Sequence, residues 1–141
     1  MQTSKKIWKA VIACLGFLIF VMPVHAESVS LSWDAPTTNT DGTPLTDLAG
    51  YNIYQGTETD VYGSPVDVGN TLCYVVTGLT VGLTYYFAAT AYDVYDNESD
   101  FSNEVNKTIT SGDTGTCGSN SIYLNWKHRN KTSGGFSGGF Q

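Results

Sequence analysis

Histidine, cysteine and basic side chains are scarce in this sequence. Of 141 residues, two are histidine, three are cysteine and seven are lysine or arginine, against thirteen aspartates and glutamates. From residue 27 onward His128 is the single histidine, which leaves too few ligands for a tetrahedral zinc site and no base for a nucleophile. The C-terminal glycines lack the lysine and following helix of a phosphate-binding loop. We therefore predict no enzyme activity and no cofactor.

Positive charge is nearly absent from the middle of the chain. Residues 27–110 carry twelve acidic side chains and one basic side chain, Lys107. Such a surface repels phosphate groups, which excludes nucleic acid and anionic membranes as primary partners. Residues 111–141 are mildly basic because Lys127, Arg129 and Lys131 outnumber Asp113. This segment is expected to be attracted to an acidic body, its own or that of a neighbour.

Only one long apolar run occurs, residues 11–22, and three lysines precede it. The run is too short for the roughly 20 residues that a helix needs to span a bilayer. The following Val24-His25-Ala26 is a small-x-small cleavage pattern. We predict that residues 1–26 are a signal peptide cleaved after Ala26. The mature protein is then secreted, periplasmic or at the cell surface, without membrane insertion; a retained anchor and lipidation of Cys14 are the alternatives.

Alternation of apolar and polar residues dominates the remainder, and no segment has an apolar period of 3.6. Val29, Leu31 and Trp33 alternate with serines, the pattern of a half-buried strand. Turn residues separate the segments of this kind. The predicted strands are residues 29–33, 50–54, 71–76, 84–92 and 103–109. Short strands about ten residues apart predict an all-β protein, an antiparallel β-sandwich.

The aromatic and aliphatic residues of these strands resemble the fibronectin type III pattern. Trp33 stands in an opening strand, Tyr51 and Ile53 in a later one, and Leu79 begins a run that continues to Phe87. The segments 97–99 and 102–105 match the loop and final strand of many bacterial members. The resemblance covers about residues 28–110 and implies a fibronectin type III-like (immunoglobulin-like) domain at residues 27–110.

The resemblance also implies two residue roles and shows two departures. Leu79 would plug the core between two strands, and Tyr85 would be the tyrosine-corner residue, bonded to backbone a few residues upstream. Val81 stands where the family usually has proline. The family normally has a strand before the one that bears Trp33, but cleavage after Ala26 leaves none. The first strand is thus missing, and the Trp33 strand is predicted to be an exposed sheet edge.

A C-terminal extension, residues 111–141, offers a segment that covers this edge. It contains a linker (111–121), a short apolar segment of strand type (121–126) and a Gly/Phe-rich end. We hypothesise that residues 121–126 pair with the open edge, in the same molecule or in a neighbour, with a disordered tail as the alternative. The candidate contact residues are Ile122, Tyr123, Leu124, Trp126, Phe136 and Phe140.

Two cysteines, Cys73 and Cys117, follow the predicted signal peptide. Exported proteins meet oxidising compartments, which favours a disulfide between them. The alternation predicts that Leu72, Tyr74 and Val76 point inward, which leaves Cys73 on the outer face within reach of the linker. An intramolecular bridge is favoured, with an intermolecular bridge and free thiols as alternatives.

Two further groups of residues are candidates for binding. Aromatic residues on the outer face could stack on sugar rings or on a partner, or merely stabilise the sheet; they are Tyr54, Tyr86, Tyr92, Tyr95 and Phe101. Acidic residues from two loops that the family brings to one end could hold Ca²⁺, or form a solvated acidic surface; they are Asp41, Asp93, Asp96 and Asp100.

Together these features predict a non-catalytic binding or adhesion module that acts through protein–protein contacts. Its partner would be another protein or further copies of itself. One alternative is a structural subunit of a surface filament, in which tails exchange strands between copies. A carbohydrate-binding module is the second alternative.

Overall fold

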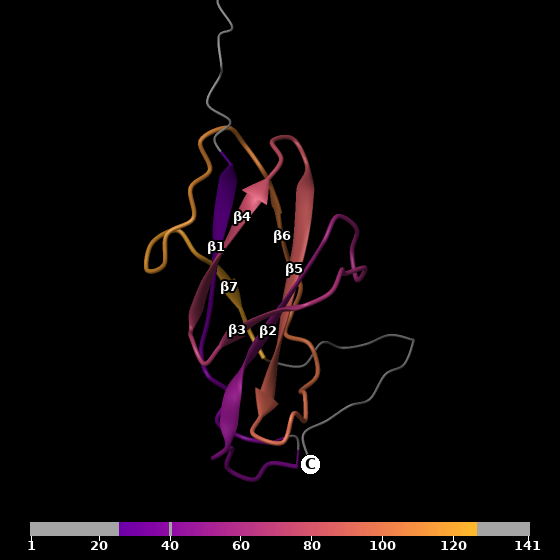
Figure 1. Cartoon of the computed structure of the whole chain (residues 1–141), viewed down its shortest axis with the longest axis vertical. Helices are drawn as coiled ribbons and strands as arrows, with labels where there is room; N and C mark the ends of the chain where they lie inside the picture. The colour runs from indigo at the N-terminus through magenta and orange to yellow at the C-terminus, as the bar shows by residue number, and fades with distance from the viewer. Residues whose placement is uncertain (1–25, 40, 127–141) are drawn as a thin grey trace, which may run out of the picture.

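The computed structural model describes residues 26–39 and 41–126. These residues contain seven β-strands and no helix. They form a three-stranded sheet of order β4-β1-β7 and a four-stranded sheet of order β3-β2-β5-β6 (Figure 1). The strands are β1 (Glu27–Trp33), β2 (Leu48–Gly56), β3 (Val66–Gly69), β4 (Cys73–Leu79), β5 (Thr84–Asp93), β6 (Val105–Thr108) and β7 (Ile122–Leu124).

The two sheets pack face to face as a fibronectin type III-like β-sandwich, which confirms the predicted fold class. Neighbouring strands are antiparallel, except that β7 runs parallel to β1. The alternation seen in the sequence explains the layers, since Val29, Leu31 and Trp33 of β1 are buried. From the opposite sheet, Tyr51 and Phe87 are wholly buried and meet them.

The turn between β4 and β5 has the contacts implied by the family resemblance. Leu79 is buried at the end of β4. The hydroxyl oxygen of Tyr85 accepts a hydrogen bond from the backbone N–H of Thr80, at 3.2 Å. Tyr85 also packs beside Phe87, with 6.3 Å between their ring centroids. This end of the sandwich is therefore closed by a core side chain and a side chain to backbone bond together.

The segment around β3 and β4 departs from the sequence prediction. Strand β3 was not predicted, and β4 begins at Cys73 rather than at residue 71. The prediction that Leu72 points inward is wrong: it lies in the β3–β4 turn, and 49% of its surface is exposed. Its backbone carbonyl still accepts the N–H of Trp33, at 3.2 Å. Tyr74 packs partly against the core and Val76 is buried, so the alternation starts only where the strand does.

Strand β1 is the middle strand of its sheet. On one side it pairs with β4, with Leu31 opposite Tyr74. On the other side it pairs with β7, with Leu31 opposite Ile122 and Trp33 opposite Leu124. The edge that the missing first strand would leave open is thus covered by β7 of the same chain. No helix of the described residues is long and apolar enough to cross a membrane.

Candidate functional site: the strap over β1 and the outer-face cluster

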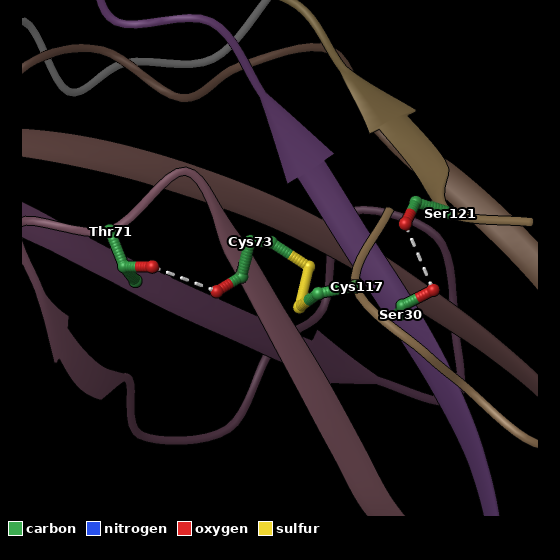
Figure 2. The surroundings of a disulfide bond; sticks show 5 residues. All are labelled: Ser30, Thr71, Cys73, Cys117 and Ser121. Atoms are coloured by element: carbon green, nitrogen blue, oxygen red, sulfur yellow. Dashed lines mark hydrogen bonds between the residues drawn. A yellow bond between two sulfur atoms is a disulfide. The ribbon is translucent and has the colours of Figure 1, made fainter. Parts of the chain in front are cut away.

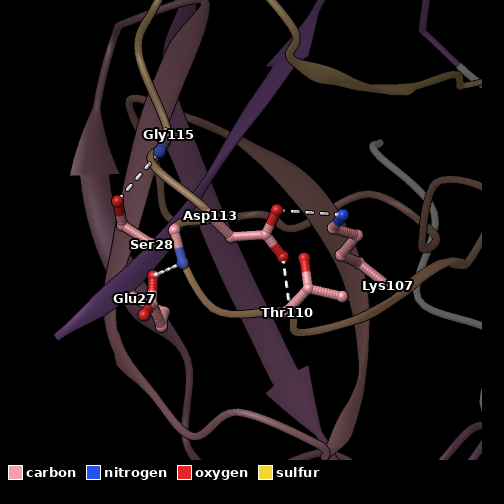
Figure 3. Close-up of polar contacts among 7 residues, drawn as sticks. Glu27, Ser28, Lys107, Thr110, Asp113 and Gly115 are labelled. Carbon is pink, nitrogen blue, oxygen red and sulfur yellow. Dashed lines mark hydrogen bonds and ion pairs between the residues drawn. The ribbon is translucent and has the colours of Figure 1, made fainter. Parts of the chain in front are cut away.

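The connection from β6 to β7, residues 110–121, lies across β1 and is called the strap here. It begins with a tight turn, in which Asp113 accepts the backbone N–H of Thr110 at 2.7 Å and forms an ion pair with Lys107 at 3.2 Å (Figure 3). The hydrogen bond from Thr110, with support from Lys107, holds the pKa of Asp113 below its usual value. The turn directs the chain away from β6 toward the start of β1.

Hydrogen bonds then attach the strap to the first two residues of β1. The N–H of Ser28 donates to the carbonyl of Asp113 at 3.0 Å, and the N–H of Gly112 donates to the Glu27 carboxylate at 3.2 Å. The N–H of Gly115 donates to the Ser28 hydroxyl at 2.8 Å (Figure 3). The side chain of Glu27 is consequently buried although it is acidic.

Gly115 lies directly on the backbone of β1. A Cβ atom at this position would stand 2.4 Å from the backbone nitrogen of Ser30 and 2.4 Å from the carbonyl carbon of Val29. Real Cβ atoms do not approach backbone so closely, so only glycine allows this contact. The strap therefore packs on β1 by backbone-to-backbone approach, which explains why Ser30 on the outer face is buried.

A disulfide fastens the middle of the strap to β4. Cys73 at the start of β4 is bonded to Cys117, with 5.8 Å between their Cα atoms (Figure 2). This confirms the predicted bridge and its intramolecular form. After Cys117 the chain turns and crosses back over β1 toward β7, and the hydroxyl of Ser121 donates to that of Ser30 at 3.0 Å (Figure 2). Cys117 is exposed and Cys73 is half-buried.

Strand β7 and the residues after it fill one end of the sandwich. Leu124 is wholly buried, and the ring of Trp126 stacks on Tyr51 with centroids 5.7 Å apart. The indole N–H of Trp126 donates to the carbonyl of Asp34 at 2.6 Å. Tyr123 points outward and donates to the Asp34 carboxylate at 2.6 Å, a bond that raises the pKa of Tyr123. Segment 121–126 thus contributes core as well as edge.

On the far sheet, three aromatic rings pack together over the outer face of β2 and β5. Ring centroids lie 4.8 Å apart for Tyr54 and Phe101, 5.5 Å for Tyr62 and Phe101, and 6.1 Å for Tyr54 and Tyr62. Ala88, which lies opposite Tyr54 in the sheet, is wholly buried. This outer-face cluster, residues 54, 62 and 101, is a small second core in which the rings contact one another.

A half-buried carboxylate, Glu98, lies beside this cluster. One oxygen of Glu98 accepts hydrogen bonds from Asn52 at 2.8 Å, from the hydroxyl of Tyr54 at 2.8 Å, and from the hydroxyl of Thr90. Burial alone would raise the pKa of Glu98, but these three bonds outweigh it and hold the pKa below its usual value of 4.5. Burial, together with Glu98, raises the pKa of Tyr54 to about 12. Glu98 therefore ties the β5–β6 loop to β2 and β5.

Glu104 makes a similar connection on the other side of the cluster. Its carboxylate accepts the hydroxyl of Thr59 at 2.6 Å, the backbone N–H of Asp60 at 2.8 Å, and the hydroxyl of Tyr62. This fixes the β2–β3 loop against the chain that leads into β6. Sequence reasoning missed Tyr62, Glu98 and Glu104 as parts of one site; the signal was the hydroxyl and amide side chains at outward positions of neighbouring strands, which need an acceptor.

The other predicted binding-face residues lie apart from the cluster. Tyr92 covers Gly50, where a Cβ would meet its ring at 2.6 Å, and donates its hydroxyl to Asp67 at 2.9 Å. Tyr86 is half-buried on β5. Tyr95 is 78% exposed in the β5–β6 loop, next to Val94 at 62%. Of the five predicted residues, the structure brings together Tyr54 and Phe101.

The acidic loop residues mostly bond to their own loops. Asp93 is buried and accepts the backbone N–H groups of Tyr95 and Asn97 and the side-chain amide of Asn97. Asp41 accepts both the N–H and the hydroxyl of Thr43. Among the described residues, no group of three or more histidine, cysteine or acidic side chains is arranged to hold a metal ion. The other calcium candidates, Asp96 and Asp100, are likewise not part of any such arrangement among the described residues.

Some predicted features lie outside the described residues. These are the signal peptide up to residue 25, the basic residues 127–131 with His128, and the tail contacts Phe136 and Phe140.

No family model matches the chain. Chitinase D of Niallia circulans is 35% identical over 101 residues, which are 72% of this chain and 17% of that protein. Exoglucanase B of Cellulomonas fimi is 35% identical over 89 residues, 63% of this chain and 7% of the enzyme. A Kelch domain-containing protein of Saccharolobus solfataricus is 37% identical over 67 residues, 48% of this chain and 8% of that protein. The chain thus spans less than a fifth of each of these relatives.

Proposed function

We propose that this protein is an exported, non-catalytic accessory module that acts by binding. The observation that carries the proposal is the size of the shared part: the similarity covers 17% of a chitinase and 7% of an exoglucanase. A segment so much shorter than the enzymes, and similar also to part of a Kelch domain-containing protein, fits a transferable sandwich better than a catalytic unit.

The engagement of the polar side chains supports a binding role over a catalytic one. A general acid or base needs a carboxylate that faces a space where substrate can sit. Glu98 and Glu104 each accept three hydrogen bonds from the protein itself, and Asp93 accepts three from its own loop. These carboxylates therefore hold loops in place.

Protein contact through the loops is the leading mode of binding. Sugar rings stack on the open faces of aromatic side chains, whereas the rings at residues 54, 62 and 101 pack on one another. The two most exposed large apolar side chains of the described residues are instead Val94 and Tyr95, in the β5–β6 loop, where Glu98 and Asp93 fix the backbone. An apolar pair held in a rigid loop suits a protein surface, because little conformational entropy is lost on contact.

A carbohydrate ligand is the second candidate. The similarity to a chitinase and an exoglucanase favours it, and Tyr95 is exposed enough to offer a ring face. Whether the protein binds a polysaccharide or another protein distinguishes the two candidates.

Co-sedimentation with insoluble polysaccharide tests the choice. Purified protein is incubated with chitin and with cellulose, alongside Tyr95→Ala and the matched exposed control Val61→Ala. We expect all three proteins to stay in the supernatant and to release no sugar from either polymer. Retention that Tyr95→Ala abolishes and Val61→Ala preserves would establish the carbohydrate alternative, and sugar release would refute the non-catalytic role.

The protein-binding mode needs a positive result of its own. The wild-type protein is immobilised and exposed to the cell-envelope fraction of the source organism, and captured proteins are identified and purified. Direct titration should then give binding that weakens about tenfold or more when Val94→Ser and Tyr95→Ala are combined, as expected for a contact centred on an aromatic anchor. Unchanged affinity would remove this loop as the binding surface.

A further inference from the structure

The strap joins two parts of the molecule that differ in how they are held. Strands β1 to β6 are held in the sandwich by extended backbone pairings, such as that of β2 with β5. Strand β7 contributes three residues, all paired with β1 alone. The strap that carries it is held by its hydrogen bonds to β1 and by one covalent bond, Cys73–Cys117.

The site on the sandwich that receives β7, called its seat below, combines backbone pairing with an apolar space. The edge of β1 supplies backbone partners, and the end of the sandwich receives Leu124 and the ring of Trp126 on Tyr51. Without β7, an unpaired strand edge and an apolar space would be exposed together, which is the arrangement that accepts a strand from another chain. The segment that fits this seat by backbone direction and side-chain size is Ile122–Trp126, and every copy of the chain brings one.

We propose that the Cys73–Cys117 disulfide is a reducible latch, and that opening it lets β7 leave β1 and pair with β1 of a second copy. The exchanged pair is reciprocal: each copy gives its β7 and receives that of its partner, so a closed dimer buries the same contacts as two monomers. Because both states bury the same groups, the balance between them depends on protein concentration and on the latch.

The chemistry of the latch is a dithiol–disulfide exchange. A thiolate of a dithiol, either a small molecule or a protein, attacks the sulfur of Cys117, which is the more exposed residue of the pair, and the S–S bond breaks with Cys73 leaving as a thiolate. The second thiol of the donor attacks the mixed disulfide and releases Cys117. Two electrons and two protons pass to the protein, and the donor becomes a disulfide. Reoxidation after exchange runs the same reaction in reverse: a small-molecule or protein disulfide accepts two electrons and two protons and becomes a dithiol, while Cys73 of one copy is joined to Cys117 of the other.

Selective cross-linking tests the exchange. Cys73→Ser and Cys117→Ser variants, both in a Cys14→Ser background, are mixed at high concentration and oxidised. Strand exchange brings the remaining Cys117 of one copy beside the remaining Cys73 of the other, so we expect the mixed disulfide dimer to exceed both like-with-like dimers by about fivefold or more. A statistical mixture of dimers, or none, would overturn the proposal.

A structure-based control separates guided exchange from chance collision. Tyr123→Ala leaves the buried seat intact and should keep the selectivity, whereas Leu124→Ala empties the seat and should lower it. If both variants keep the selectivity, β7 does not guide the cross-link.

Hydrogen exchange measures the opening step without requiring a dimer. The amides of Ile122 and Leu124 are followed in the wild-type disulfide form and in the Cys73→Ser/Cys117→Ser variant. We expect their protection to fall by about tenfold or more in the variant while the amides of β2 and β5 change less, as for a local unit that opens alone. An equal fall in all strands would overturn the latch. A local fall in a protein that stays monomeric at every concentration would overturn the second copy as occupant.

Discussion

Replacing Leu124 by alanine measures whether the three residues of β7 are part of the cooperative core. The side chain is wholly buried between the sheets, although it lies near the far end of the described chain and in its shortest strand. Removing a fully buried leucine side chain costs about 2–5 kcal/mol, from lost apolar burial and from the cavity left behind. Tyr123 in the same strand is 46% exposed, and Tyr123→Ala should cost less than about 1 kcal/mol.

The magnitude has a ceiling that the structure defines. If Leu124→Ala weakens the contacts of β7 enough, the strap and β7 detach while the other six strands stay folded. The loss of stability then cannot exceed the free energy with which the strap and β7 dock on the rest of the sandwich. Trp126→Ala, which removes the ring stacked on Tyr51, tests this. If the segment is already detached in one single variant, the double variant Leu124→Ala/Trp126→Ala should be no less stable than the less stable of the two single variants.

Urea unfolding, followed by tryptophan fluorescence and by far-ultraviolet circular dichroism, is the suitable assay. With a slope of about 1–2 kcal/mol per molar urea for a domain of this size, a loss of about 2–5 kcal/mol for Leu124→Ala should lower the midpoint by roughly 1–5 M. A midpoint within about 0.3 M of wild type would refute the assignment of β7 to the core, and an equal shift for Tyr123→Ala would refute the assigned orientation of the strand.

Three further predictions concern the strap and the outer face. Gly115→Ala, whose new Cβ meets the β1 backbone at 2.4 Å, should cost about 1–3 kcal/mol in urea unfolding, while Gly63→Ala, with its nearest contact at 3.7 Å, should be near neutral. The Cys73→Ser/Cys117→Ser variant should lose about 4 kcal/mol in the same assay by the chain-entropy relation for a separation of 44 residues, and less if strain or residual structure intervenes. Because its folded pKa is lowered, Glu98 stabilises the protein above its unfolded pKa, and this contribution disappears as pH falls through the folded pKa. The stability difference between wild type and Glu98→Gln should therefore shrink between pH 6 and pH 3; a constant difference would contradict the assigned role.

Sequence pattern was a good guide wherever burial alternates along a strand. The serines between Val29, Leu31 and Trp33 place β1, and the small and aromatic residues of β5 follow the same rule. Strand β3 escaped because Val66–Gly69 is too short to show a period and none of its four residues is fully buried. Leu72 was assigned to the wrong side because the period was extended back into a turn, where side-chain direction is set by local backbone rather than by the pleat.

The candidate site was predictable only in part. The disulfide followed from two cysteines and an outward-facing strand position, which are local facts. The outer-face cluster required loops that are distant in sequence: Tyr62 and Phe101 arrive from different connections, and Glu98 reaches Asn52 across 46 residues. A single sequence contains the acceptors and the donors but not the loop paths that join them. The same holds for Gly115, whose need for glycine comes from a strand far away in the chain.

The parallel pairing of β7 with β1 fixes the order in which this chain can complete itself. The contacts that join them link residues that are almost the whole domain apart, such as Ser30 and Ser121 at a separation of 91 and Asp34 and Trp126 at 92. Contacts of such long range form late, because closing a long loop costs entropy before any contact compensates for it. A chain emerging from its N-terminus therefore exposes the first strand earliest, and the edge of that strand that receives β7 is covered last. During that interval the half-finished sheet is the part of the molecule most open to proteases, chaperones and neighbouring chains.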